Sequence, residues 1–212
     1  MPKRKPNARY VRFTEEENAL DYLERAYEAL LRLPRQPQQW KWIVISLHGA
    51  LYGFAICVLK GTDWEGVTRG PSKKLIPFGE AMQRCQSLDS MGFYTFSKPL
   101  QLTPEQKDSI RFLKARRNQL EHYVPMRSLI EAHDLTVTAI DAIDVARFLA
   151  LESGNVRLKL SQRQRVQACT AKARRLLEES QLYKEYLAAK KRHDRSKGSV
   201  VDVLAPPKGS RD

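Results

Sequence analysis

The sequence predicts an all-α protein with one packed domain and a long basic helix toward its C-terminus. Two observations favour this class. Apolar residues recur at helical spacing in several segments, and two of these segments open with a Thr-led capping sequence. No sustained apolar–polar alternation typical of strands stands out, although Val156–Leu160 could be briefly extended. With 212 residues, 42% of them hydrophobic, the chain can bury one sizeable core.

The first predicted helix begins directly after Thr14. The run Thr14-Glu15-Glu16-Glu17 is a capping box that places acids at the positive end of the helix dipole. Apolar residues then repeat at helical spacing until Pro34 ends the pattern: Leu20, Leu23, Tyr27, Leu30 and Leu31.

The most apolar stretch, Trp42–Leu59, lies between Lys41 and Lys60. Its length is at the lower limit for a membrane-spanning helix, where about 20 residues are usual. The alternative is a core helix surrounded by other helices. We favour the core helix, because the other segments are amphipathic and need an apolar partner, and we expect no membrane. His48 in this stretch is interpreted as a hydrogen-bonded core histidine.

The region between the apolar helix and residue 102 is predicted to contain mostly loops. Gly61 ends the apolar helix, and residues 61–77 form a polar loop with several glycines and prolines. A shorter helix is expected around Phe78–Leu88, followed by an irregular link over residues 89–102.

The helix after Thr103 has the clearest start signal. The run Thr103-Pro104-Glu105-Gln106 combines an N-cap Thr, a Pro at the first helical position and a Gln that completes a capping box. We expect this helix to run to Tyr123 and to be ended by Pro125.

A further helix over about residues 127–152 completes the packed domain, which Ser153-Gly154-Asn155 closes. A basic amphipathic helix is then expected over about Ser161–His193, its apolar stripe packing on the domain or on a second copy. The predicted organisation is a basic disordered arm (1–12), a helical domain (13–154), a basic amphipathic C-terminal helix (155–195) and a disordered tail (196–212).

Basic residues gather at the two ends of the chain. Residues 1–12 carry five Lys or Arg and no acid, and residues 155–212 carry fifteen against six acids. The middle of the chain is nearly balanced, so the ends account for the net charge of +13. Such ends suit the phosphate backbone of a nucleic acid. The alternative is that they serve only as solubilising tails.

The cysteines and histidines are scattered. Three cysteines and four histidines occur without a Cys-x-x-Cys pair or a zinc-binding spacing. This argues against a disulfide framework and a zinc site and is typical of a reducing compartment, so we expect a cytoplasmic protein without metal or cofactor. No apolar run follows the basic N-terminus as in a signal peptide.

The chemistry that remains lies in the run from Arg116 to His122. Asn118 and His122 are four residues apart and share a helix face, which the long side chain of Arg117 can also reach. A histidine can move protons to and from a hydroxyl, and a guanidinium binds phosphate oxygens. Without metal ligands, this pair suits cleavage of RNA, whose 2′-hydroxyl is an internal nucleophile.

On these residues the sequence resembles the HEPN superfamily of small helical nucleases and nucleotide-binding domains. The signature is an Arg followed by a polar residue and, four to six residues on, a His, here Arg117-Asn118 and His122. The resemblance covers roughly residues 14–150 and implies a four- to five-helix bundle that forms a homodimer. It also implies metal-independent endoribonuclease activity, often as a toxin or phage-defence component, with a cognate antitoxin or regulatory protein as a further partner.

The roles that we predict follow from this resemblance and from the residue types. His122 is the general acid/base, Arg117 stabilises the phosphate, and Asn118 orients the site, while Lys114 and Arg116 hold the RNA backbone. Two other Arg–His pairs match the spacing, but only Arg117 is followed by an Asn. The alternative function is a non-catalytic module that binds nucleic acid or protein on the same scaffold.

Overall fold

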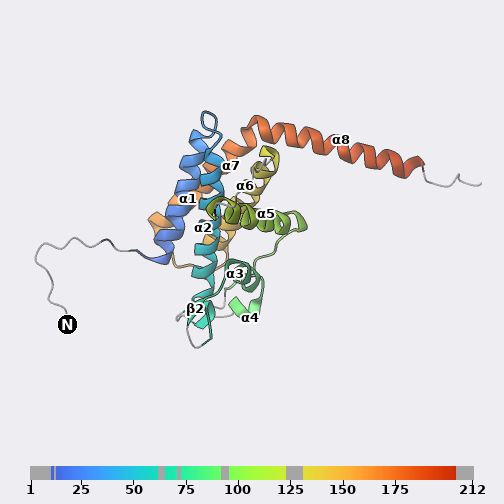
Figure 1. The fold of residues 1–212 in the computed structure, drawn as a ribbon. Helices are drawn as coiled ribbons and strands as arrows, with labels where there is room; N and C mark the ends of the chain where they lie inside the picture. Colours follow the sequence, from blue (N-terminus) through green and yellow to red (C-terminus); the bar gives the residue numbers. More distant parts are fainter. Residues whose placement is uncertain are drawn as a thin grey trace, which may run out of the picture.

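The computed structural model describes residue 11 and residues 13–61, 65–70, 73–91, 96–122 and 131–203, with side chains as far as Arg192. These residues are almost wholly helical, which confirms the all-α class (Figure 1). The predicted basic arm therefore lies outside the described residues, except for Val11. The body of the molecule is arranged around α2 (Gln39–Leu59), which contacts helices on several sides.

Helix α1 (Glu15–Arg32) begins where the sequence predicted. The Thr14 side chain accepts a hydrogen bond from the backbone N–H of Glu17 at 3.2 Å. The Glu17 carboxylate does not return the contact as a capping box would; it accepts a hydrogen bond from Gln162 at 2.8 Å. Glu17 thus connects the first turn of α1 to a helix late in the chain.

Helices α1 and α2 form a hairpin whose close approach depends on two glycines. A Cβ at Gly53 would lie 2.7 Å from the Cβ of Ala19, and one at Gly49 would lie 2.6 Å from the ring of Tyr22. Contacts this short do not occur between real side chains, so both positions require glycine at the observed helix spacing.

The prediction that the apolar stretch is a core helix is confirmed by its burial. Leu47, Leu51 and Phe54 are at most 1% exposed and pack in the hydrophobic core. Among the described residues, α2 is the one helix long and apolar enough to cross a membrane, and 72% of its most apolar window is buried inside the protein. Its apolar surface is therefore covered largely by the other helices.

The segment from Gly61 to α5 is more structured than predicted. Gly61 has a φ of 58° and ends α2 as expected. A short turn (Glu65–Val67) leads to a two-stranded antiparallel sheet, β1 (Thr68–Arg69) and β2 (Lys74–Leu75). Two short helices follow, α3 (Phe78–Arg84) and α4 (Leu88–Met91), where one helix to Leu88 was predicted.

Helix α5 (Pro104–Glu121) has the predicted capping box, with Thr103 and Gln106 exchanging hydrogen bonds of 3.2 Å. Helix α6 (Ala132–Arg147) continues into a π-helical turn, η2 (Phe148–Glu152), so the predicted helix is regular only in part. Tyr123, Pro125 and residues 127–130 lie outside the described residues.

The predicted closing segment Ser153–Asn155 is buried inside the body. The Asn155 amide donates to the carbonyl oxygens of Val58 and Met91, both at 3.1 Å. It also accepts from the Ser97 hydroxyl at 2.6 Å. One buried side chain therefore fixes the end of α2, α4 and the following link in place.

The basic helix predicted over about 161–193 is in fact two helices, α7 (Leu160–Glu179) and α8 (Gln181–Val203). The break falls at Ser180, whose hydroxyl donates to the Leu177 carbonyl at 2.6 Å and accepts from the Tyr183 N–H at 3.2 Å. A serine that bonds its own backbone neighbours in this way favours a helix boundary.

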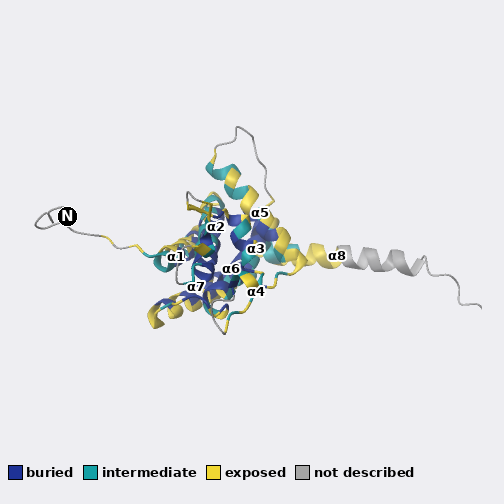
Figure 2. Cartoon of the chain, turned by 90° about the horizontal axis from the view of Figure 1, so that it is seen from below, coloured by how far each residue is buried: buried dark blue, intermediate teal, exposed yellow. Residues whose placement is uncertain are grey.

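The two helices differ in how they relate to the body. The apolar stripe of α7 packs on α1 and α6, and its buried members belong to the core: Val166, Cys169, Ala173 and Leu177. Helix α8 starts against α6 and then projects away from the body (Figures 1 and 2). It continues into the tail predicted from residue 196, and residues 204–212 lie outside the described residues.

Candidate functional site

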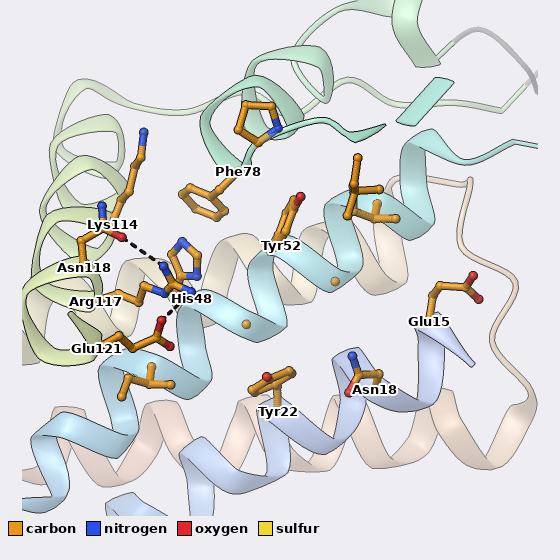
Figure 3. Close-up of a pocket in the computed structure, with 16 residues that line it drawn as sticks. Glu15, Asn18, Tyr22, His48, Tyr52, Phe78, Lys114, Arg117, Asn118 and Glu121 are labelled. Atoms are coloured by element: carbon orange, nitrogen blue, oxygen red, sulfur yellow. Dashed lines mark hydrogen bonds and ion pairs between the residues drawn. The ribbon is translucent and has the colours of Figure 1, made fainter. Parts of the chain in front are cut away.

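One face of α5 carries most of the predicted site residues. Lys114, Arg117, Asn118 and Glu121 are separated by three, one and three residues, so they form a single stripe on the helix. All four line a cavity of about 520 Å³ (Figure 3). Because α5 packs on α2 and α6, this stripe faces the central helix of the body.

The opposite walls of the cavity come from α1, α2, β2 and the start of α3. They are mainly apolar and aromatic, with one acid and one amide from α1 (Figure 3). The lining residues are Glu15, Asn18, Tyr22, Ile45, His48, Gly49, Tyr52, Gly53, Ile56, Leu75, Pro77 and Phe78. The cavity therefore has cations on one side and aromatic rings on the other.

Arg117 is held in position by two neighbours on α5. Its Nη2 lies 2.5 Å from a carboxylate oxygen of Glu121, and its Nη1 donates to the Asn118 side-chain oxygen at 3.1 Å. The side chains of Arg117 and Glu121 are each 30% exposed, so solvent still reaches the pair. The guanidinium is thus oriented, and its charge is partly compensated, before any ligand arrives.

His48 is the histidine that faces these groups. It is 7% exposed, and its ring lies against the Phe78 ring with centroids 4.2 Å apart. Burial, followed by the nearby charges of Arg117 and Lys114, lowers the pKa of His48 to about 4. The imidazole is therefore neutral at physiological pH and can both accept and donate a hydrogen bond.

Tyr52, one turn along α2 from His48, is fixed by a hydrogen bond from its hydroxyl to the carbonyl oxygen of Ile76. Its ring meets the Phe78 ring edge-on, with centroids 6.1 Å apart. Burial raises the pKa of Tyr52, so its hydroxyl stays protonated and continues to donate. The hydrogen bond and the ring contact together hold Tyr52 against Phe78.

The remaining predicted residues lie elsewhere on α5. His122 is the exposed C-cap residue, whose backbone N–H donates to the Asn118 carbonyl at 3.1 Å, and it does not line the cavity. Arg116 donates to Gln119 at 2.8 Å and lies 4.6 Å from the Phe112 ring centroid. The structure therefore brings Lys114, Arg117 and Asn118 together and leaves His122 and Arg116 outside this cavity.

His48 is the residue of the site that the sequence did not predict as functional. The prediction of burial is confirmed, but no described residue forms a hydrogen bond with its side chain, and the ring lines the cavity. His48, Gly49, Tyr52 and Gly53 share one helix face by their spacing, but the sequence does not show that this face stays open.

The cysteines lie in the interior of the protein. Cys57, Cys85 and Cys169 are buried and free of disulfides. Burial raises the pKa of Cys85 and of Cys169 to about 12 and also raises that of Cys57. Such thiols are poor nucleophiles. Among the described residues, no group of three or more His, Cys, Asp or Glu side chains gathers as a metal-ligand set.

Comparison of the chain with known proteins gives no relative from which a role could be transferred. No protein-family model, no curated protein and no solved structure matches this chain.

Proposed function

We propose that the protein is a metal-independent endoribonuclease that binds an RNA phosphate on the α5 face formed by Lys114, Arg117 and Asn118. The observation that carries this proposal is the convergence of these side chains and neutral His48 on one cavity. A guanidinium binds two phosphate oxygens at once, and a nearby ammonium adds to the local positive charge. The notable feature is that both cations face a partly apolar space, where charge interactions are strengthened.

In the proposed reaction the 2′-hydroxyl of the RNA attacks the adjacent phosphorus. A new O2′–P bond forms while the bond to the 5′-oxygen of the next nucleotide breaks. The base takes the 2′-hydroxyl proton, and an acid supplies a proton to the leaving 5′-oxygen, which gives a 2′,3′-cyclic phosphate. Arg117 neutralises the charge that develops on the phosphate oxygens, and its contact with Asn118 fixes the direction of the guanidinium.

We assign the proton transfers to His122 and a positioning role to His48. A base with a pKa of about 4 is too weak to take a proton efficiently near neutrality, which disfavours His48 in the acid/base role. His122 is exposed at the end of α5, four residues beyond Asn118. In the homodimer that we propose, the exposed end of α5 meets that of the second copy, and the two helix ends complete the site.

The second candidate is a non-catalytic RNA-binding module. Two observations favour it: His122 does not line the cavity, and Arg117 is already paired with Glu121. Under this candidate the cavity binds a phosphate that displaces Glu121 from the guanidinium, and no bond is broken.

The two candidates are separated by incubating the purified protein with several single-stranded RNAs, with and without chelator. The ribonuclease proposal expects cleavage that EDTA does not change, 2′,3′-cyclic phosphate ends, and intact 2′-deoxy substrates. Arg117→Ala should lower turnover by about 10²–10³-fold, and His122→Ala by about 10²–10⁴-fold.

Two matched variants serve as controls. Arg175→Ala removes an exposed, ion-paired arginine from α7, and His133→Ala removes a histidine paired with Glu185 outside the cavity. Both should retain wild-type turnover. RNA binding without cleavage would support the binding module. Cleavage that survives loss of Arg117 and His122 but not of His133 would move the site away from α5.

A further inference from the structure

A groove continues from the cavity along α5. On the far side of Phe78 and Lys114, which line both spaces, a second cavity of about 380 Å³ lies between α3 and α5. Its floor is formed by the buried side chains of Phe78, Met82 and Ile110. Because two lining residues are shared, the two cavities adjoin at Lys114.

The α5 wall of this groove carries a row of cations. Lys107, Arg111 and Lys114 line the second cavity, and Arg117 lines the first. Successive members are four, three and three residues apart and thus lie along one side of the helix. At a rise of 1.5 Å per residue the row is about 15 Å long.

These cations are available to an external anion. Neither Lys107 nor Lys114 forms an ion pair with a described residue. Arg111 pairs with Asp108, but the two side chains are 79% and 69% exposed, and pairs in such high-dielectric surroundings contribute little and are readily exchanged. The groove therefore presents two lysines that no described acid neutralises and one arginine whose ion pair is highly exposed.

The α3 wall has a different chemistry. Gln83 and Gln86 are exposed and line the second cavity above its apolar floor. Amides can donate and accept hydrogen bonds at base edges, and the Phe78 and Met82 side chains offer apolar contact to base faces. A third cavity nearby is unlike this one, because its arginines, Arg69 and Arg84, both pair with Glu80.

We infer that a single-stranded RNA segment lies in the α3–α5 groove, with its phosphates on Lys107, Arg111 and Lys114 and its bases toward α3, and leads into the cavity at Arg117. The inference rests on the proposed RNA-binding function and assigns the substrate class and its path. A duplex keeps its bases stacked inside and cannot present them to an apolar floor, whereas a single strand can. Base contacts through Gln83 and Gln86 would add sequence preference to the phosphate contacts.

The test measures binding without cleavage. A short labelled single-stranded RNA with 2′-O-methyl sugars is titrated with full-length protein over a range of KCl concentrations, and fluorescence anisotropy gives Kd. Each phosphate contact to a single strand contributes about 0.7 to the slope of log K against log salt. The Lys107→Gln/Arg111→Gln double variant should therefore bind more weakly, with a slope reduced by about 1.4.

The matched control is Lys172→Gln/Arg175→Gln on α7. Arg175 has the same side-chain exposure as Arg111, 79%, and is likewise paired with an acid on its own helix. This variant should keep the wild-type slope. An unchanged slope in the groove variant, or an equal loss in both variants, would overturn the inference.

A steric variant tests the groove without altering its charge. A Cβ at Gly79 would lie 3.4 Å from the Nζ of Lys114, at the junction of the two cavities. Gly79→Met should weaken binding of the single strand more than that of a duplex of the same length. If Gly79→Met and Lys107→Gln/Arg111→Gln both bind the single strand with wild-type affinity, the groove is not its binding site, even if cleavage occurs. If the groove variants bind RNA more weakly but the wild type cleaves no RNA, only the nuclease proposal is contradicted.

Discussion

Helices α5 and α7 carry the same number of positive charges and use them in opposite ways. They are 18 and 20 residues long, and each contains five Lys or Arg. On α7, three arginines are in ion pairs: Arg165 with Glu17 and Glu24 of α1, Arg174 with Asp144 of α6 and with Glu178, and Arg175 with Glu179. On α5, Arg111 and Arg117 pair only with acids of the same helix, Asp108 and Glu121. Lys107 and Lys114 pair with no described acid.

The two helices also differ in how they are anchored. Helix α7 buries a stripe that includes Val166 and Leu177 against α1 and α6. The buried residues of α5 are fewer: Ser109, Ile110 and Leu113. The difference shows that the number of cations on a helix does not identify a ligand-binding surface. What matters is whether acids on neighbouring helices lie opposite those cations, and α1 and α6 supply them only to α7.

The largest expected effect tests α7 as a structural helix. Leu177 is 2% exposed, and truncating a buried leucine costs about 2–5 kcal/mol because it removes apolar contact and leaves a cavity. We expect Leu177→Ala to lower the free energy of unfolding by that amount in urea denaturation, while folded variant protein binds RNA as the wild type does. Lys114→Gln should instead leave the free energy of unfolding nearly unchanged and weaken RNA binding. A stable Leu177→Ala protein that no longer binds RNA would contradict the assignment of a structural role to α7.

An effect of similar size is expected from His48, which faces the cations of α5. Its pKa is about 4 in the folded protein and about 6.5 when unfolded, so between these values only the unfolded chain binds the proton. Stability should therefore be highest above pH 6.5 and should fall by about 3 kcal/mol as the pH falls to 4. Urea denaturation of the wild type at several pH values between 6.5 and 4 should show this fall in the free energy of unfolding.

The control for this prediction is His48→Gln, which keeps a neutral polar side chain and removes the titration. The other charged and titratable residues that line the cavity are Glu15, Tyr22, Tyr52, Lys114, Arg117 and Glu121. Since they remain in the variant, any part of the pH dependence that persists belongs to them or to more distant groups. If the free energy of unfolding depends on pH in the same way in both proteins, the lowered pKa of buried His48 is not the cause of the dependence.

The smallest expected effect concerns the ion pairs of α7. Arg165 contacts Glu24 at 2.7 Å and Glu17 at 3.4 Å, with its side chain 44% exposed. Exposed pairs contribute about 0.2–1 kcal/mol, so Arg165→Gln should lower the free energy of unfolding by no more than that. The loss should be larger at low salt than at high salt, because salt screens exposed ion pairs. RNA affinity should not change. A clear loss of RNA binding would place part of the nucleic-acid surface on α7.

The sequence predicted the helices that have strong local signals. Thr14 and Thr103 begin α1 and α5 as expected, and the apolar stretch became the central helix. The β1–β2 pair was missed, because strands of two residues are too short to show alternation. The break at Ser180 was missed as well, because apolar residues continue at helical spacing across it, and only a backbone-bonding hydroxyl marks the boundary.

The site was predictable on α5 and not on α2. Lys114, Arg117 and Asn118 share a face by spacing alone, and the structure places them at one cavity. His48 could not be assigned from the sequence, since a helix that is apolar all round shows no preferred face. Which side of α2 would remain open depends on how close α1 approaches, and that distance is a property of the packed structure.

Gly49 has a consequence for what the cavity can accept. A methyl group at this position would press on the ring of Tyr22, which lines the cavity and is 37% exposed. The ring would have to move, and the shape of the space beside it would change, without any substitution on α5. The width of the cavity is thus determined by the α1–α2 hairpin, and its positive charge by α5. Ligand size and ligand charge can therefore change independently during evolution, through substitutions on different helices.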